Sequence, residues 1–182
     1  CIIPYARGRV RSRKMEEVLE EITNLTKHGC QEFVITGIHV TSYGKDLGDV
    51  TLIDLLEEIA KIPEVKRIRL GSLEPGFITK DTLDRLSKME SFCPHFHLSL
   101  QSGCDTTLER MNRRYRSAEY AEKCGLLRKY LGNPALTTDV IVGFPMETEE
   151  DFQASYDFVK DIHFYETHIF KYSRRHGTKA AA

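Results

Sequence analysis

The stretch EFVITGIHVTSYGKDLGDVTLIDLLEEIAKIPEVKRIRL, residues 32–70, decides the fold class of this chain. It begins with a short apolar run that leads into a long polar loop ending at Gly48. A pattern with helical period starts at Thr51, which has the character of a capping box, and Pro63 prevents its continuation before a second apolar run. Two short buried strands on either side of a helix are typical of a βαβ unit, in which the strands are parallel and the crossover is right-handed.

The same alternation of apolar runs and amphipathic helical patterns continues to the end of the chain. The predicted strands lie at residues 32–36, 66–70, 96–100, 136–142 and 166–172. Ser12 is the expected N-cap of the first helix, and Thr148 is that of the last. This order predicts an α/β fold with five to six parallel strands, either an open doubly wound sheet or part of a (β/α) barrel. A complete barrel needs about 250 residues, so we expect one domain over residues 1–182 that forms a partial barrel at most.

Composition and charge restrict the possible partners and compartments. With 26 basic and 27 acidic residues the net charge is −1, so a nucleic-acid surface must come from a local concentration of basic residues. The chain has no run of about eighteen apolar residues and no leader pattern, which predicts neither a membrane span nor a secretory signal. Its five cysteines contain no C-x-x-C pair, which argues against a disulfide framework and a self-contained zinc site. We therefore expect a cytoplasmic protein with reduced thiols.

The N-terminal segment CIIPYARGRVRSR, residues 1–13, combines a cysteine with alternate arginines. These arginines are Arg7, Arg9, Arg11 and Arg13. In an extended segment the two-residue side-chain period would place their guanidinium groups on one face, close to the thiol of Cys1. A thiolate next to such a positive face suggests a metal or nucleophile site near a polyanion. The alternative is a solvated charge run next to an incidental cysteine.

Polar residues and glycines follow the first four predicted strands. They are Thr36, Gly37, Ser72, Glu74, Gln101, Ser102 and Gly143, with Asp139 inside the fourth strand. Ligands bind at the carboxyl ends of the strands in parallel α/β folds, so we expect these residues to form one binding rim. Taken singly, each is more commonly a turn residue than a ligand contact. The chain has no G-x-G-x-x-G or Walker motif, which argues against the usual dinucleotide and triphosphate sites.

Histidines and further cysteines offer weaker signals. His95 and His97 stand two residues apart at a strand, where both imidazoles would share one face as a metal pair requires. No third ligand stands nearby in the sequence, so we interpret them as hydrogen-bonded structural histidines. We interpret the remaining cysteines mainly as small buried hydrophobic residues: Cys30, Cys93, Cys104 and Cys124. Of these, Cys104 is expected to lie nearest the rim.

Five motifs resemble the radical S-adenosylmethionine (radical SAM) core of the tRNA methylthiotransferases. They are CIIPYARGRVRSR at 1–13, TGIHVTSYG at 36–44, SLEP at 72–75, HLSLQSGCD at 97–105 and TDVIVGFP at 138–145. The arginine segment and the GIHV loop are most similar to the type that methylthiolates N6-threonylcarbamoyladenosine beside the anticodon. The types that act on isopentenyladenosine in tRNA or on a ribosomal protein are alternatives, as is a non-catalytic RNA-binding α/β module. Met146 departs from the family, which usually has glycine there.

The resemblance implies two cofactors in this core. A 4Fe–4S cluster would be held by a C-x-x-x-C-x-x-C motif of which Cys1 is the last cysteine, leaving one iron free to bind S-adenosylmethionine at the rim. Reductive cleavage would then give a deoxyadenosyl radical, with an electron donor such as flavodoxin or ferredoxin. The resemblance also implies a second 4Fe–4S cluster in an N-terminal methylthiotransferase domain and a C-terminal TRAM domain. Residues 1–182 would contain neither domain, so we expect this truncated radical SAM core to be inactive alone.

The resemblance also makes the tRNA anticodon stem-loop the expected polyanion, with no membrane partner. The arginines of residues 1–13 would hold its phosphates, together with a second patch of Arg113, Arg114 and Arg116. The alternative is that some of these arginines, Arg13 first among them, pair with acidic residues and brace the fold. The acidic candidates are Glu16, Glu17 and Glu74.

Overall fold

The computed structural model of the chain describes residues 3–181. Its helices are α1 (Ile3–Arg7), α2 (Met15–Thr26), α3 (Leu52–Ala60), α4 (Lys80–Leu86), α5 (Asp105–Arg110), α6 (Ser117–Leu131) and α7 (Glu149–Ile162). Its strands are β1 (Glu32–Ile35), β2 (Arg67–Leu70), β3 (His95–His97), β4 (Ala135–Val142) and β5 (Glu166–Lys171). Short 3-10 helices lie at Val40–Ser42, Pro75–Phe77 and Lys179–Ala181.

The strands form one parallel arrangement in chain order. β1 pairs with β2, β3 with β4, and β4 with β5, each time in parallel. Parallel bridges Ile68–Phe92 and Leu73–Leu98 connect the neighbourhood of β2 to that of β3. The predicted α/β fold with five parallel strands is therefore confirmed. A doubly wound sheet reverses its strand order at a switch point, whereas this order does not reverse, which favours the partial barrel.

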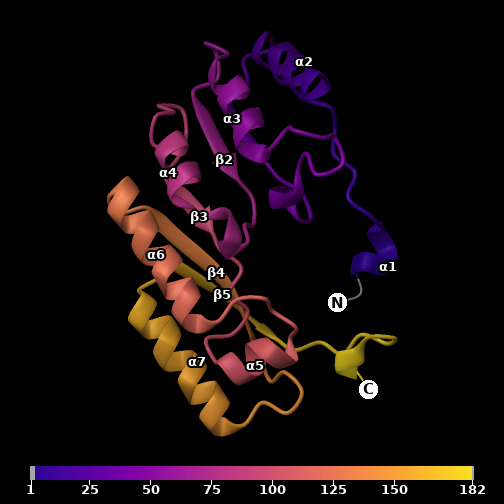
Figure 1. Cartoon of the computed structure of the whole chain (residues 1–182), viewed down its shortest axis with the longest axis vertical. Helices are drawn as coiled ribbons and strands as arrows, with labels where there is room; N and C mark the ends of the chain where they lie inside the picture. The colour runs from indigo at the N-terminus through magenta and orange to yellow at the C-terminus, as the bar shows by residue number, and fades with distance from the viewer. Residues whose placement is uncertain (1–2, 182) are drawn as a thin grey trace.

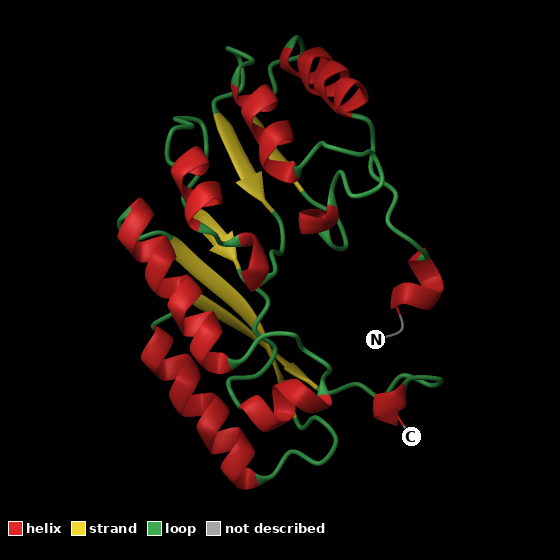
Figure 2. Cartoon of the chain, viewed as in Figure 1, coloured by secondary structure: helices red, strands yellow, loops and turns green. Residues whose placement is uncertain are grey.

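Helices α2, α3, α4, α6 and α7 form a layer on one side of the strands. Successive helices contact one another, α2 with α3, α3 with α4, α4 with α6, and α6 with α7. Figure 1 shows α4, α6 and α7 along one side of the strands, while both chain ends lie on the other side. The strand arrows run in one direction (Figure 2). Their carboxyl ends therefore lie together at one edge of the strand arrangement.

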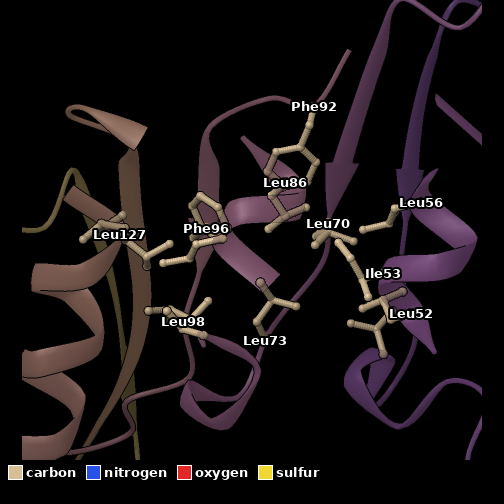
Figure 3. Close-up of a cluster of buried hydrophobic side chains, with 14 of the residues drawn as sticks. Leu52, Ile53, Leu56, Leu70, Leu73, Leu86, Phe92, Phe96, Leu98 and Leu127 are labelled. Carbon is tan, nitrogen blue, oxygen red and sulfur yellow. The ribbon is translucent and has the colours of Figure 1, made fainter. Parts of the chain in front are cut away.

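The hydrophobic core fills the space between the strands and this helix layer. Phe96 and Leu98 are fully buried, as is Leu56 of α3. In Figure 3 their side chains belong to a cluster that runs from α3 past β2 and α4 to Leu127 of α6. Burial of each such side chain contributes about 1.5–3 kcal/mol, so this cluster fixes the strands beneath the rim.

Threonines cap three of these helices. Thr51, Thr79 and Thr148 precede α3, α4 and α7, and each side chain accepts a hydrogen bond from the backbone N–H three residues later. Such a cap stabilises a helix start by about 1 kcal/mol. The predicted caps at Thr51 and Thr148 are confirmed. Within residues 3–181 no helix is long and apolar enough to cross a membrane.

The N-terminal segment meets the condition of an extended run only in part, and one expectation about it was wrong. The segment is not extended throughout, because Ile3–Arg7 is helical, and proline is compatible with the first turn of a helix. Ser12 is also not the N-cap of α2, because that position belongs to Lys14. The Asp46 carboxylate instead accepts hydrogen bonds from the backbone N–H (2.9 Å) and hydroxyl (2.6 Å) of Ser12, which lower the pKa of Asp46. Ser12 thus ties the arginine segment to the loop after β1.

Candidate functional site

Parallel pairing continues beyond the strand ends and brings the predicted rim residues to one edge. The Gly71 N–H donates to Ile35 O at 2.9 Å, which joins the ends of β1 and β2. The Leu73 N–H donates to His97 O at 2.8 Å. The Gln101 N–H donates to Asp139 O at 2.8 Å, which joins the chain after β3 to β4. The residues after the first four strands therefore stand next to one another along a single edge.

The first two strand ends approach each other closely. A Cβ added to Gly71 would lie 2.6 Å from Thr36 Oγ1, closer than real Cβ contacts allow. The absence of a side chain at Gly71 therefore lets Thr36 and Gly37 lie against the segment that carries Ser72 and Glu74. Thr36, Gly37 and Ser72 are exposed.

Glu74 is positioned by a residue of the long loop after β1. His39 Nε2 lies 2.9 Å from Glu74 Oε2, and His39 Nδ1 contacts the hydroxyl of Ser42. The side chains of His39 and Glu74 remain 41% and 49% exposed, so the carboxylate is held and still accessible. The sequence contains no local signal for this pair, because the two residues meet only through the β1–β2 pairing.

Asp139 is positioned by a histidine of β3. His97 Nε2 lies 3.3 Å from Asp139 Oδ2, and His97 Nδ1 lies 2.9 Å from Thr137 Oγ1. His97 is thus a hydrogen-bonded strand histidine, as predicted. Burial lowers the pKa of the neighbouring His95, with the nearby Arg69 charge adding to the effect. Within residues 3–181 no group of three or more His, Cys, Asp and Glu side chains is arranged to hold a metal ion.

The two predicted rim residues in the segment that follows β3 have different surroundings. Gln101 has a left-handed backbone (φ +71°) and continues the pairing with β4. A non-glycine residue in this region is typical of a strained functional position. Ser102 is fully buried, and its hydroxyl lies between Ser155 Oγ (3.4 Å) and the Cys104 N–H (3.2 Å). Ser102 therefore lies beneath the rim and braces it against α7.

Gly143 starts a tight turn after β4. Gly143 (φ +74°) and Met146 (φ +65°) are both left-handed, and Gly143 N–H donates to the Glu147 carboxylate. Met146, where the resemblance leads to the expectation of glycine, thus keeps a backbone conformation that glycine adopts freely. Its side chain points into solvent, and the residue is 78% exposed.

Arg113 is partly buried, unlike the exposed Arg114 beside it. Its Nε is buried and has no hydrogen-bond partner within residues 3–181. Burial raises the pKa of Tyr115 to about 12, an effect that the charge of Arg113 opposes and that of Glu74 reinforces, so both charges lie near this phenol. The Tyr115 hydroxyl is directed at Ser99 O (2.6 Å) and Leu100 O (2.9 Å). Sequence reasoning placed Arg113 only in an RNA-binding patch, because an unsatisfied buried nitrogen becomes visible only in the folded chain.

The other predicted arginines differ in how they are engaged. Arg7, Arg9 and Arg11 are exposed, as is Arg114. Arg13 forms an ion pair with Glu21, which fits the alternative that this arginine braces the fold, although Glu21 was not among the acidic candidates. Arg116 is bound to Glu109 (3.1 Å) and to the Asp105 carbonyl (3.0 Å). Cys1, the predicted cluster ligand, lies outside the described residues.

Comparison with known proteins extends these observations. Residues 1–159 match the Radical SAM superfamily. Over 182 residues the chain is 44% identical to the threonylcarbamoyladenosine tRNA methylthiotransferase MtaB of Bacillus subtilis, covering 100% of this chain and 40% of that protein. It is 42% identical over 182 residues to the tRNA-2-methylthio-N(6)-dimethylallyladenosine synthase of Acetivibrio thermocellus, covering 100% of this chain and 38% of that protein. The chain therefore spans about two fifths of the length of these curated relatives.

Solved structures share the fold. Coproporphyrinogen III oxidase (HemN) from Escherichia coli, a radical SAM enzyme, matches 92% of this chain and 40% of its own with a TM-score of 0.64 and 19% identity. The cobalamin-dependent S-adenosylmethionine radical enzyme OxsB, with aqua-cobalamin bound, matches 80% of this chain and 22% of its own with a TM-score of 0.62 and 14% identity. At these identities the likeness concerns the partial barrel alone.

Proposed function

The chain belongs to the radical SAM superfamily, and we propose that it forms the core of a tRNA methylthiotransferase. In the whole protein this core would help to add a methylthio group to N6-threonylcarbamoyladenosine beside the anticodon. The 44% identity to a protein named for that substrate supports this choice. A relative named for dimethylallyladenosine is nearly as similar, at 42%. The arginine segment of residues 1–13 and the GIHV loop, residues 37–40, are therefore the features that favour threonylcarbamoyladenosine.

One observation carries the cofactor assignment, which is the pairing of opposite charges at the rim. Glu74 offers a half-exposed carboxylate, and Arg113 offers a guanidinium whose Nε is buried without a partner. An unsatisfied buried donor is costly, so a ligand that accepts its hydrogen bond gains affinity. The ammonium and carboxylate of the methionine moiety of S-adenosylmethionine complement Glu74 and Arg113 respectively. The residues present therefore fit this cofactor.

The remaining rim residues suit a nucleoside. Gln101 and the Asp139 carboxylate would accept or donate hydrogen bonds at the ribose hydroxyls. Adenine would lie against the glycines and short hydroxyl side chains, where a planar base can approach the backbone: Thr36, Gly37, Ser72 and Gly143. Ser102 would support this surface from below, because its hydroxyl already has partners.

The positioning of these groups defines what the chain itself contributes. His39 would hold Glu74 against the ammonium, and His97 would hold Asp139 against the ribose. Both contacts exist without a ligand, so the binding groups need little rearrangement and cofactor binding costs less ordering. When bound to a reduced 4Fe–4S cluster, S-adenosylmethionine supplies a deoxyadenosyl radical.

The cluster, the electron donor and the second cluster concern the whole protein. We propose Cys1 as one thiolate ligand of the 4Fe–4S cluster, with the other ligands outside residues 1–182. A flavodoxin or ferredoxin in the cytoplasm would supply the electron. A second 4Fe–4S cluster, in the N-terminal domain expected of the family, would provide the sulfur.

The RNA would approach along exposed arginines. Arg7, Arg9 and Arg11 are exposed, so their guanidinium groups can contact phosphates of the anticodon stem-loop. Arg114 would add to this surface. Arg116 would contribute less, because Glu109 and the Asp105 carbonyl already bind it.

The whole protein provides the decisive test. After anaerobic reconstitution with iron and sulfide, we expect the Cys1→Ala variant to lose iron at the radical SAM cluster and to stop cleaving S-adenosylmethionine. A non-catalytic RNA-binding module would take up no cluster in either form. Nucleoside mass spectrometry of tRNA incubated with the reconstituted protein then separates threonylcarbamoyladenosine from isopentenyladenosine as the substrate. Methylthiolation of a ribosomal protein in place of either tRNA would refute the tRNA assignment.

A further inference from the structure

The turn after β4 has an unfavourable backbone at one position. Gly143 and Met146 are both left-handed, with φ of +74° and +65°. Glycine adopts this region freely, whereas a residue with a Cβ is disfavoured there. The Met146 side chain is exposed and packs against little that could compensate. Another part of the chain must therefore hold the turn.

Arg110, at the end of α5, provides that contact. Its Nη1 donates to the Met146 carbonyl at 2.8 Å and to Asp151 Oδ2 at 2.8 Å. The side chains of Arg110 and Asp151 are only 27% and 14% exposed, so solvent weakens this ion pair less than a surface pair.

Asp151 is itself fixed from two further directions. Cys104 Sγ donates to Asp151 Oδ1 at 3.3 Å, and the Thr148 N–H donates to Oδ2 at 3.3 Å as part of the cap of α7. The hydrogen bond from Arg110 is the main cause of the lowered pKa of Asp151, which keeps the carboxylate charged. Arg110 is thus held at a fixed place between α5, α7 and the turn.

We infer that Arg110 is a positioning residue that holds the turn of residues 143–147 in its left-handed form at Met146, and so fixes the β4 side of the S-adenosylmethionine site. This inference rests on the proposed function, because Gly143 belongs to the proposed adenine surface. Arg110 itself does not touch the cofactor. The competing role is a structural staple between α5 and α7, in which the contact with Asp151 matters and the one with Met146 does not.

A double-mutant cycle between positions 110 and 146 separates these roles. Arg110→Gln removes the charge and the double contact, and Met146→Gly removes the backbone penalty that Arg110 offsets. In the cofactor-free chain we expect Arg110→Gln to speed amide hydrogen exchange in residues 143–147 by about tenfold, and by much less in the Met146→Gly background. Arg128→Gln is the matched control, because Arg128 also binds backbone carbonyls, of Ile162 and His163, at the far end of α7.

Equilibrium dialysis with S-adenosylmethionine on the reconstituted whole protein gives the second measurement. We expect the dissociation constant to rise about tenfold in Arg110→Gln and to recover when Met146→Gly is added. Equal effects of Arg110→Gln in both backgrounds would overturn the inference in favour of the staple. Faster exchange with unchanged affinity would likewise overturn the positioning role. If the wild-type protein binds no S-adenosylmethionine, the proposed function fails and the positioning role fails with it, although the exchange data still decide whether Arg110 holds the turn.

Discussion

His39 Nε2 lies 2.9 Å from Glu74 Oε2 and joins the loop after β1 to the segment after β2. Each of these segments leaves its strand at the carboxyl edge, so the pair spans the entrance to the proposed methionine site. The two side chains are about equally exposed, which leaves the second carboxylate oxygen of Glu74 available to a ligand.

Glu74→Gln should weaken S-adenosylmethionine binding more than His39→Gln does. Loss of the carboxylate removes a charged hydrogen bond to the ammonium, so we expect the dissociation constant to rise at least about tenfold. His39→Gln keeps the charge of Glu74 and removes only the contact that orients it, so we expect the dissociation constant to rise about twofold to threefold. Isothermal titration of the reconstituted protein measures both constants. Glu64→Gln, at an exposed acidic residue outside the site, should leave them unchanged; a similar loss there would contradict the assignment of Glu74.

The order of strands and helices could be predicted because its signals are local. Thr51 and Thr148 cap helices through hydrogen bonds to residues only three positions later, and short apolar runs predict the strands. The common position of the rim residues could also be predicted, because the carboxyl ends of parallel strands lie at one edge. Ser12 shows the limit of this reasoning. Serine is a residue type that favours the N-cap position, but the Ser12 hydroxyl instead donates a hydrogen bond to Asp46, which lies 34 residues away.

The missed features of the site share the same cause. His39 meets Glu74 across two strands, and the buried Nε of Arg113 is left without a partner only in the folded chain. No periodicity or motif spacing encodes such contacts. Cys30 is a smaller case: it was expected to be buried with the other cysteines, but it is exposed because it lies in the turn before β1.

Arg85 should stabilise the chain in a pH-dependent way. It joins α4 to α3 through Glu57 (2.6 and 2.8 Å) and Asp54 (2.5 Å). The hydrogen bond from Arg85 is the main cause of the lowered pKa of Glu57. Burial opposes the shift at Asp54, but the Arg85 and Thr51 hydrogen bonds still lower that pKa. Carboxylates with lowered folded pKa values add stability above their ordinary values, and this stability is lost as the pH falls through the folded values.

Arg85→Met should therefore lower the free energy of unfolding by about 1 kcal/mol at pH 7. The difference from wild type should shrink as the pH falls below the ordinary carboxylate values of about 4 and through the lowered folded pKa values. Urea unfolding at pH 7 and at pH 3 measures this. Lys61→Met removes a more exposed ion pair with Glu58 and should change little at either pH. An equal loss for Arg85→Met at both pH values would mean that packing, rather than charge, explains its contribution.

Among the described cysteines, only Cys30 should react readily with a thiol reagent. Cys30 is exposed, whereas Cys93, Cys104 and Cys124 are buried. Burial also raises the pKa of Cys124 to about 12, which removes its reactive thiolate at neutral pH. Iodoacetamide labelling followed by peptide mass spectrometry should modify Cys30 in the native chain and the other three only after denaturation. Labelling of Cys124 at the rate of Cys30 in the native chain would contradict the burial of Cys124.

Among the described arginines, those of residues 7–13 should contribute most to the salt dependence of RNA binding. Arg9 and Arg11 are exposed, and no ion pair engages them within residues 3–181, whereas Arg13 is paired with Glu21. Each free guanidinium that contacts a phosphate releases a counterion, so it adds about 0.7 to the slope of log affinity against log salt for single-stranded RNA. Neutralising Arg9 and Arg11 with glutamine should therefore flatten that slope by up to about 1.4.

Arg13→Gln is the matched control, because its charge lies in the same segment but is already neutralised by Glu21. Fluorescence anisotropy of the whole protein with an anticodon stem-loop, over a series of salt concentrations, gives all three slopes. We expect the double variant to keep S-adenosylmethionine cleavage, because neither arginine is among the residues proposed to bind the cofactor. If Arg13→Gln flattens the slope as much as the double variant, the segment acts through its fold rather than through phosphate contacts. If the double variant instead loses cofactor cleavage while its slope stays unchanged, these arginines support the rim, and RNA binding belongs to other parts of the protein.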